Sequence, residues 1–165
     1  MERCMYCGDS RGTDIDHFEP IKIAPFRTFD WPNHLLACSS CNSNAKRDAY
    51  PCDEHGKSLL VNPSFEDPSD HLKLTLSVGM YMGITHKGSV TIQVFQLNRI
   101  DLRMGREAAF ARCKSMLRDY LNLEASRKLD EAATTKLALE RQPFADVLHA
   151  MYKVVDLPGA PLWTR

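Results

Sequence analysis

The sequence lacks a net charge and long apolar runs, and each absence removes a class of protein. Its 165 residues hold 21 Lys and Arg against 21 Asp and Glu, so any positive charge that binds nucleic acid must be gathered on one face. No stretch approaches the ~18 uninterrupted apolar residues of a membrane span. No apolar signal segment follows Met1. We therefore expect a cytoplasmic protein that has no membrane association.

What the chain does have is an ordinary globular composition. Hydrophobic residues make up 44% and charged residues 25% of the sequence, which fits a chain that buries a core. This length suits one domain, or one small module with an appendage. We expect residues 1–60 to form a metal-stabilised core and residues 61–165 an accessory region that packs on it as part of one domain.

Four of the six cysteines form two closely spaced pairs. The pairs are Cys4-Met5-Tyr6-Cys7 and Cys38-Ser39-Ser40-Cys41. In a reducing compartment such CxxC pairs are typical of metal ligands, and two of them make a tetrahedral cage of four sulfurs for structural zinc. Cys52 and Cys113 have no such partner, so we interpret them as ordinary small residues.

Periodicity predicts an α+β protein. Alternating polarity predicts strands, and a spacing near 3.6 residues predicts helices. The predicted strands are 14–18, 72–78 and 90–94, the last two belonging to a small antiparallel region with a turn at 86–88. The predicted helices are a short one at 42–47, a long one from residue 100, one at 129–141 and one from Pro143 towards Val155; a non-helical tail follows at 157–161.

Four polar residues near the cysteine pairs suit phosphodiester hydrolysis. An imidazole such as His17 can take a proton from water near neutral pH. A hard cation such as Mg²⁺ takes oxygen ligands, which Asp16 and Asn42 can supply. Asn33 can accept a hydrogen bond from the His17 ring and hold its tautomer. Neighbouring strand residues point to opposite faces, so Asp16 and His17 need a local bend to serve one site.

Taken in order, these residues resemble the zinc-containing branch of the HNH endonucleases. The pattern is Cys4-x-x-Cys7, Asp16-His17-x-x-Pro20, Asn33, Cys38-x-x-Cys41-Asn42 and Lys46, over about residues 4–47. The resemblance implies a ββα-metal fold, in which a hairpin and a helix grip one catalytic metal, Mg²⁺ or Mn²⁺. It also implies that His17 is the general base, that Asn33 holds the second motif position, and that Asp16 and Asn42 are the catalytic metal ligands.

The resemblance leaves one ligand open and extends loosely beyond the motif. Many family members place a lysine three residues after the motif asparagine, whereas Lys46 lies four after Asn42, so Asn44 is the alternative ligand and Asn42 then a helix cap. The later residues look like those of small bacterial HNH proteins that are often encoded with ATPases in anti-phage defence. That likeness implies a partner, such as a defence-system ATPase or another targeting protein.

Several basic residues and one aromatic residue each allow a functional and a structural interpretation. The predicted nucleic-acid contacts are Lys46, Arg47, Arg99, Arg103 and Arg106, the last three spaced along one helical face. A solvated helical face is the alternative for that stripe. Trp31 is either a packing residue or loop anchor, or a platform for base stacking.

The sequence therefore predicts a metal-dependent endonuclease that hydrolyses DNA. Because one active site cuts one strand, cutting both requires a homodimer or a second binding event. The alternative is a non-catalytic zinc-knuckle module that binds nucleic acid or protein, and a weaker alternative is an RNA-directed nuclease. A pure binding module has no use for Asp16, His17, Asn33 and Asn42, which favours the enzyme.

Overall fold

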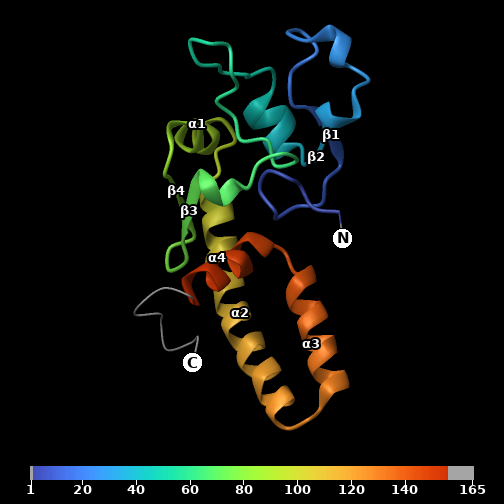
Figure 1. Ribbon diagram of the computed structural model, residues 1–165, viewed down its shortest axis with the longest axis vertical. Helices are drawn as coiled ribbons and strands as arrows, with labels where there is room; N and C mark the ends of the chain where they lie inside the picture. Colours follow the sequence, from blue (N-terminus) through green and yellow to red (C-terminus); the bar gives the residue numbers. More distant parts are fainter. Residues whose placement is uncertain (1, 156–165) are drawn as a thin grey trace.

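The computed structural model describes residues 2–155, and Figure 1 shows their arrangement. Two small antiparallel sheets lie in the first half of the chain, and α-helices make up the second half. The strands are β1 (Asp14–His17), β2 (His34–Ala37), β3 (Leu72–Thr75) and β4 (Met80–Gly83). The α-helices are α1 (His86–Val94), α2 (Ile100–Ala125), α3 (Leu129–Arg141) and α4 (Ala145–Val155). Single turns of 3₁₀ helix are η1 (Pro25–Arg27), η2 (Trp31–Asn33) and η4 (Pro68–Asp70), and η3 (Ser40–Lys46) is a π-helix.

The N-terminal hairpin and the helix that follows it match the predicted order of elements. β1 pairs with β2 so that Asp16 faces Leu35 and His17 faces His34. Side chains alternate across a strand, and accordingly Asp16 and Leu35 are buried whereas the two histidines are half-buried. η3 begins inside the second cysteine pair and packs on β1. The predicted strand and short helix are thus confirmed.

The predicted third strand at 90–94 is wrong, because these residues belong to helix α1. The Thr85 hydroxyl caps this helix by accepting a hydrogen bond from the Gly88 amide at 3.0 Å. The buried positions Gly88, Thr91 and Phe95 then recur with a helical spacing. A side chain at 88 would collide with the His71 carbonyl oxygen, 2.0 Å from where its Cβ would lie. The predicted turn at 86–88 is therefore the first turn of α1.

The C-terminal helices were largely predictable from their spacing. α2 and α3 form a long antiparallel hairpin that extends away from the N-terminal region (Figure 1). α4 packs against α2 and β3 through its buried face. It begins at Ala145, two residues after the predicted start at Pro143, and follows Phe144, whose φ is 62°. The predicted tail at 157–161 lies outside the described residues.

One hydrophobic cluster connects the cysteine pairs to the helices. It extends from Cys4 through Leu35 and Phe95 to Met151 at the C-terminal end. The Tyr6 and Phe95 rings stack at a centroid distance of 3.9 Å, which joins the first cysteine pair to the end of α1. The boundary near residue 60 stays a prediction. No helix in the described part of the chain combines the length and apolar character needed to cross a bilayer.

Candidate active site and metal centre

The four paired cysteines converge on one point in the core. All four are buried, and their sulfur atoms lie within 4.8 Å of one another. The sulfurs of Cys7 and Cys38 are 3.9 Å apart, and a tetrahedral zinc with Zn–S bonds of ~2.3 Å places its sulfurs ~3.8 Å apart. None of the four is in a disulfide. The donor set and its spacing therefore fit a metal ion such as zinc.

A cationic side chain also lies against the cluster. Hydrogen bonds to the Cys4 and Cys7 sulfurs, together with burial, raise the pKa of the Cys41 thiol. The Arg99 guanidinium lies against the same sulfur, with its two terminal nitrogens 3.9 and 4.0 Å away. Four thiolates holding a divalent ion would carry a net negative charge, and Arg99 would offset part of it.

His17 lies at the end of β1, on the face of the hairpin that is partly open. Its Nε2 lies 3.1 Å from the Thr28 carbonyl oxygen, and Nε2 of His34 lies 2.8 Å from the same oxygen. The two imidazoles meet edge to face at 4.8 Å. Because a carbonyl can only accept a hydrogen bond, Nε2 of His17 is the protonated nitrogen and Nδ1 of the neutral ring has the free lone pair. His17 is thus held in a tautomer that can accept a proton.

Asp16 points the opposite way and is engaged in the interior. Its carboxylate forms an ion pair with the buried Lys46 ammonium at 2.9 Å and accepts a hydrogen bond from the Tyr6 hydroxyl. Burial raises the pKa of Asp16, although Lys46 and Tyr6 act in the other direction. Lys46 also donates to the His17 carbonyl oxygen at 2.9 Å. The hairpin therefore has no bend that turns Asp16 and His17 towards one point.

The Asp16–Lys46 pair gives a stability prediction. We expect Lys46→Met to lower the free energy of unfolding by about 3–5 kcal/mol, because it leaves the Asp16 carboxylate buried without its cation. The double variant Asp16→Asn/Lys46→Met should recover much of this loss. Denaturant unfolding of the metal-loaded protein measures both variants. A loss below about 1 kcal/mol for Lys46→Met would contradict a buried pair.

Asn33 holds the connection between the two strands. Its side-chain oxygen accepts from the Glu19 amide at 2.8 Å, and its Nδ2 donates to the carbonyls of Glu19 and Arg27 at 3.1 and 3.2 Å. The predicted hydrogen bond from the His17 ring to Asn33 is wrong, since that ring contacts Thr28 instead. Asn33 acts on His17 indirectly, by fixing the loop that carries Thr28.

The two candidate asparagine ligands face different environments on η3. Asn42 is half-buried and follows the buried Cys41, whereas Asn44 is exposed. The buried Lys46 lies four residues after Asn42 on the same helix. Asn42 is therefore nearer the side of η3 that packs on β1.

Two of the five predicted nucleic-acid contacts are buried, so this role is wrong for both. Lys46 is 1% exposed and bonded to Asp16. Arg106 is also 1% exposed, and its Nη1 donates to the carbonyls of Gly79 and Leu97 at 3.1 and 2.8 Å. The helical face that carries the predicted stripe also carries the core residues Leu102, Ala109 and Cys113, so it points inward.

The other three basic residues differ in their access to solvent. Arg99 is half-buried between Cys41 and Asp101, to whose carboxylate its Nε lies at 3.1 Å. Arg103 is half-buried, and Arg47 is exposed after the end of η3. Arg47 is therefore the best placed of the five for contact with a phosphate.

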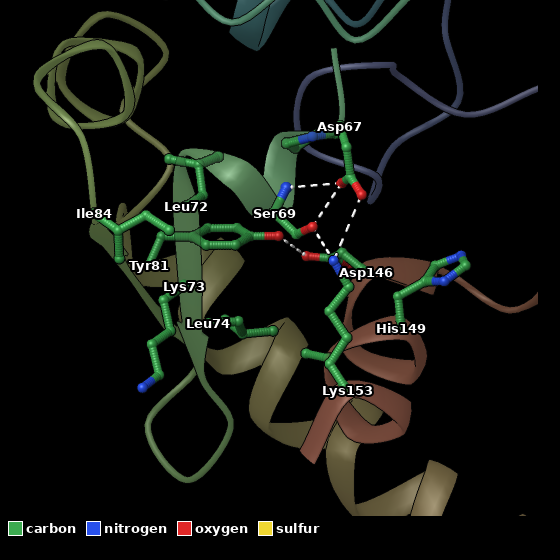
Figure 2. A pocket seen from close by; sticks show the side chains of 12 residues that line it. Asp67, Ser69, Leu72, Lys73, Leu74, Tyr81, Ile84, Asp146, His149 and Lys153 are labelled. Atoms are coloured by element: carbon green, nitrogen blue, oxygen red, sulfur yellow. Dashed lines mark hydrogen bonds and ion pairs between the residues drawn. The ribbon is translucent and has the colours of Figure 1, made fainter. Parts of the chain in front are cut away.

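A separate cavity of about 520 Å³ lies between η4, the β3–β4 hairpin and α4 (Figure 2). The Tyr81 hydroxyl donates to the Asp146 carboxylate at 2.5 Å on its wall. Asp146 lies 3.3 Å from Nε of the buried Arg106, whose guanidinium stacks over the Tyr81 ring. None of the predicted site residues lines this cavity. It lies outside the candidate active site, because its lining residues all come from residues 67–153.

Sequence reasoning missed three contributors to the site. Tyr6 lies inside the first cysteine pair, and a polar aromatic between two metal ligands is a usable signal for a contact with the motif. Thr28 acts through its backbone carbonyl, which leaves no trace in the choice of side chain. Arg99 was assigned to nucleic acid, and only the tertiary fold shows its contact with Cys41.

Comparison with known proteins agrees with the geometry of this region. Residues 4–48 match the HNH endonuclease family model. The Septu protein PtuB of Bacillus thuringiensis is 26% identical over 87% of this chain, and the Septu protein PtuB of Bacillus mycoides (strain KBAB4) is 26% identical over 93%. The chain spans about 60% of the length of both curated relatives. No solved structure shows a significant match. Residues 4–48 are therefore similar to the HNH endonuclease domain, as their cysteine pairs and motif residues predict.

Proposed function

We propose that this protein is a metal-dependent endonuclease that hydrolyses DNA phosphodiester bonds, with His17 as its general base. The observation that carries the proposal is the half-buried His17 imidazole, held through Nε2 on the Thr28 carbonyl within the matched HNH region. The free Nδ1 takes a proton from the attacking water. The four cysteines hold structural zinc, which ties both ends of the motif segment together.

A catalytic Mg²⁺ or Mn²⁺ ion would be held by Asn42 and, after rearrangement, Asp16. Bound there, such an ion supplies charge stabilisation to the leaving oxygen. Asn42 fits this role, because its side chain is partly open on the helix that packs on β1. Both Asp16 oxygens are engaged by Lys46 and Tyr6, so Asp16 can ligate an ion only after one of these partners releases it.

Metal dependence separates this enzyme from a zinc-knuckle binding module. Plasmid DNA incubated with the protein and Mg²⁺ or Mn²⁺ should be nicked or linearised, and a chelator should stop the reaction. RNA of the same sequence tests the RNA-directed alternative. A protein that retains zinc and folds normally but cuts neither substrate is the binding module instead.

The same assay tests the asparagine ligand. We expect Asn42→Ala to lower the cleavage rate at least about tenfold and to raise the Mg²⁺ concentration that is needed. Asn44→Ala, on the exposed side of η3, is the matched control and should cut like the wild type. The reverse result would move the ligand to Asn44.

The biological role that we propose is anti-phage defence together with a targeting protein. Similarity to the Septu PtuB proteins over most of this chain supports it. The formal net charge of zero supports a partner, because the chain lacks the general positive field that would attract DNA without help.

A further inference from the structure

The connection between β1 and β2 exposes an unusual amount of aromatic surface. We call residues 20–32 the aromatic loop; Phe26 is 101%, Phe29 94% and Trp31 81% exposed. Ile21 and Ile23 in the same loop are also exposed. A short loop with this many exposed apolar side chains is typical of a binding site. In Figure 1 this loop lies at the end of the molecule opposite to the turn between α2 and α3.

The aromatic loop is held in place rather than left loose. Asn33 joins the two ends of the loop by its hydrogen bonds with Glu19, and it holds the middle of the loop through the Arg27 carbonyl. Arg27 forms ion pairs with Glu19 and, at 2.9 Å, with Asp30. Two turns of 3₁₀ helix, η1 and η2, also lie within the loop. The backbone that carries the rings is therefore held in place, which lowers the backbone entropy lost when something binds to the loop.

The loop is continuous with the proposed catalytic histidine. Thr28, between two of the exposed rings, supplies the carbonyl that holds both His17 and His34. The Trp31 ring lies 6.2 Å from the His34 ring, which lies 4.8 Å from the His17 ring. Two ring-to-ring contacts thus connect Trp31 to His17. A strand cut at His17 therefore passes within reach of Trp31.

The charges of the loop indicate which part of a nucleic acid it meets. Its basic residue Arg27 is neutralised by Glu19 and Asp30, which leaves Lys22 as the exposed cation. The loop thus has little positive charge with which to bind a phosphate backbone. It has three exposed aromatic rings on which a base could stack. Every base has a π-face, but only an unpaired or unstacked base exposes it.

We propose that the aromatic loop is a stacking platform that binds unpaired bases of the nucleic acid next to the cleavage point, with Trp31 nearest to the active site. This proposal rests on the proposed nuclease function and deepens it, because it makes single-stranded or locally opened nucleic acid the preferred substrate. It also assigns Trp31 to the second of its two predicted roles, since a residue that is 81% exposed is not a packing residue.

Binding by a cleavage-deficient protein tests the platform directly. In the full chain carrying His17→Ala, the probes are a single-stranded DNA oligonucleotide, the RNA of the same sequence and the fully paired DNA duplex. Adding Trp31→Ala should weaken single-strand binding roughly 5- to 150-fold, the contribution of one base stacked on an aromatic ring. Trp31→Phe should restore most of the affinity, and duplex binding should change little. Phe65→Ala, an exposed aromatic elsewhere, is the matched control.

The outcomes separate this proposal from the nuclease function itself. The proposal is overturned if the His17→Ala protein does not bind the single-stranded DNA. It is also overturned if adding Trp31→Ala leaves that binding unchanged. In either case the loop is a surface for a protein partner. If the wild type binds single strands through Trp31 but cuts nothing, the platform stands and the nuclease function fails. If the wild type cuts and the triple variant Phe26→Ala/Phe29→Ala/Trp31→Ala cuts with an unchanged KM, only the platform fails.

Discussion

Replacing His17 with alanine should reduce DNA cleavage about 10²–10⁴-fold, the typical effect of removing an essential general base. Zinc content and melting temperature should stay near those of the wild type, because the ring is half-buried and its one hydrogen bond goes to the Thr28 carbonyl. Conversion of supercoiled to open-circle or linear plasmid measures the rate. Loss of cleavage with the fold intact is the combination that assigns chemistry to this residue.

His55→Ala supplies the matched control for this experiment. His55 is exposed in a turn outside the hairpin, and its removal should leave cleavage unchanged. A His17→Ala protein that cuts at the wild-type rate would remove the proposed mechanism. Equal losses for His17→Ala and His55→Ala would point to a general effect on the protein instead.

Replacing Cys41 with serine should remove bound zinc and unfold the N-terminal region. Structural zinc contributes about 10–16 kcal/mol in small zinc-binding peptides, whereas a whole domain is stable by only about 5–15 kcal/mol. Cys41 is 0% exposed, and its sulfur contacts the half-buried Arg99, so the variant also weakens that contact. We expect a large fall in melting temperature and no detectable cleavage.

Metal analysis and thermal unfolding measure this second effect. The wild type should carry one zinc per chain, and a strong chelator should lower its melting temperature to that of Cys41→Ser. Cys52→Ser is the control, since Cys52 is exposed and lies outside the cluster. A Cys41→Ser protein with normal zinc content and normal melting would show that the cluster is not the metal site.

The predictable parts of this fold depend on short-range patterns. A CxxC pair places two sulfurs on one tight turn whatever surrounds it, so both pairs could be recognised as parts of one cluster. The helix from residue 100 repeats its apolar spacing over many turns, which makes its type unambiguous. By contrast, the five residues 90–94 fit a strand and a helix equally well, and the cap at Thr85 and the packing of Gly88 decided for the helix.

The features of the candidate site likewise fall into those that the sequence predicts and those that only the tertiary structure reveals. The sequence by itself determined which side chains are available: the four cysteines, His17, Asn33 and the asparagines after the second pair. Tertiary structure alone decided that Asp16 and Lys46 neutralise each other in the interior and that Arg106 braces the hairpin against α4. It also decided that Thr28 orients His17. The physical reason is that charge pairing and burial depend on residues distant along the chain, which no local spacing specifies.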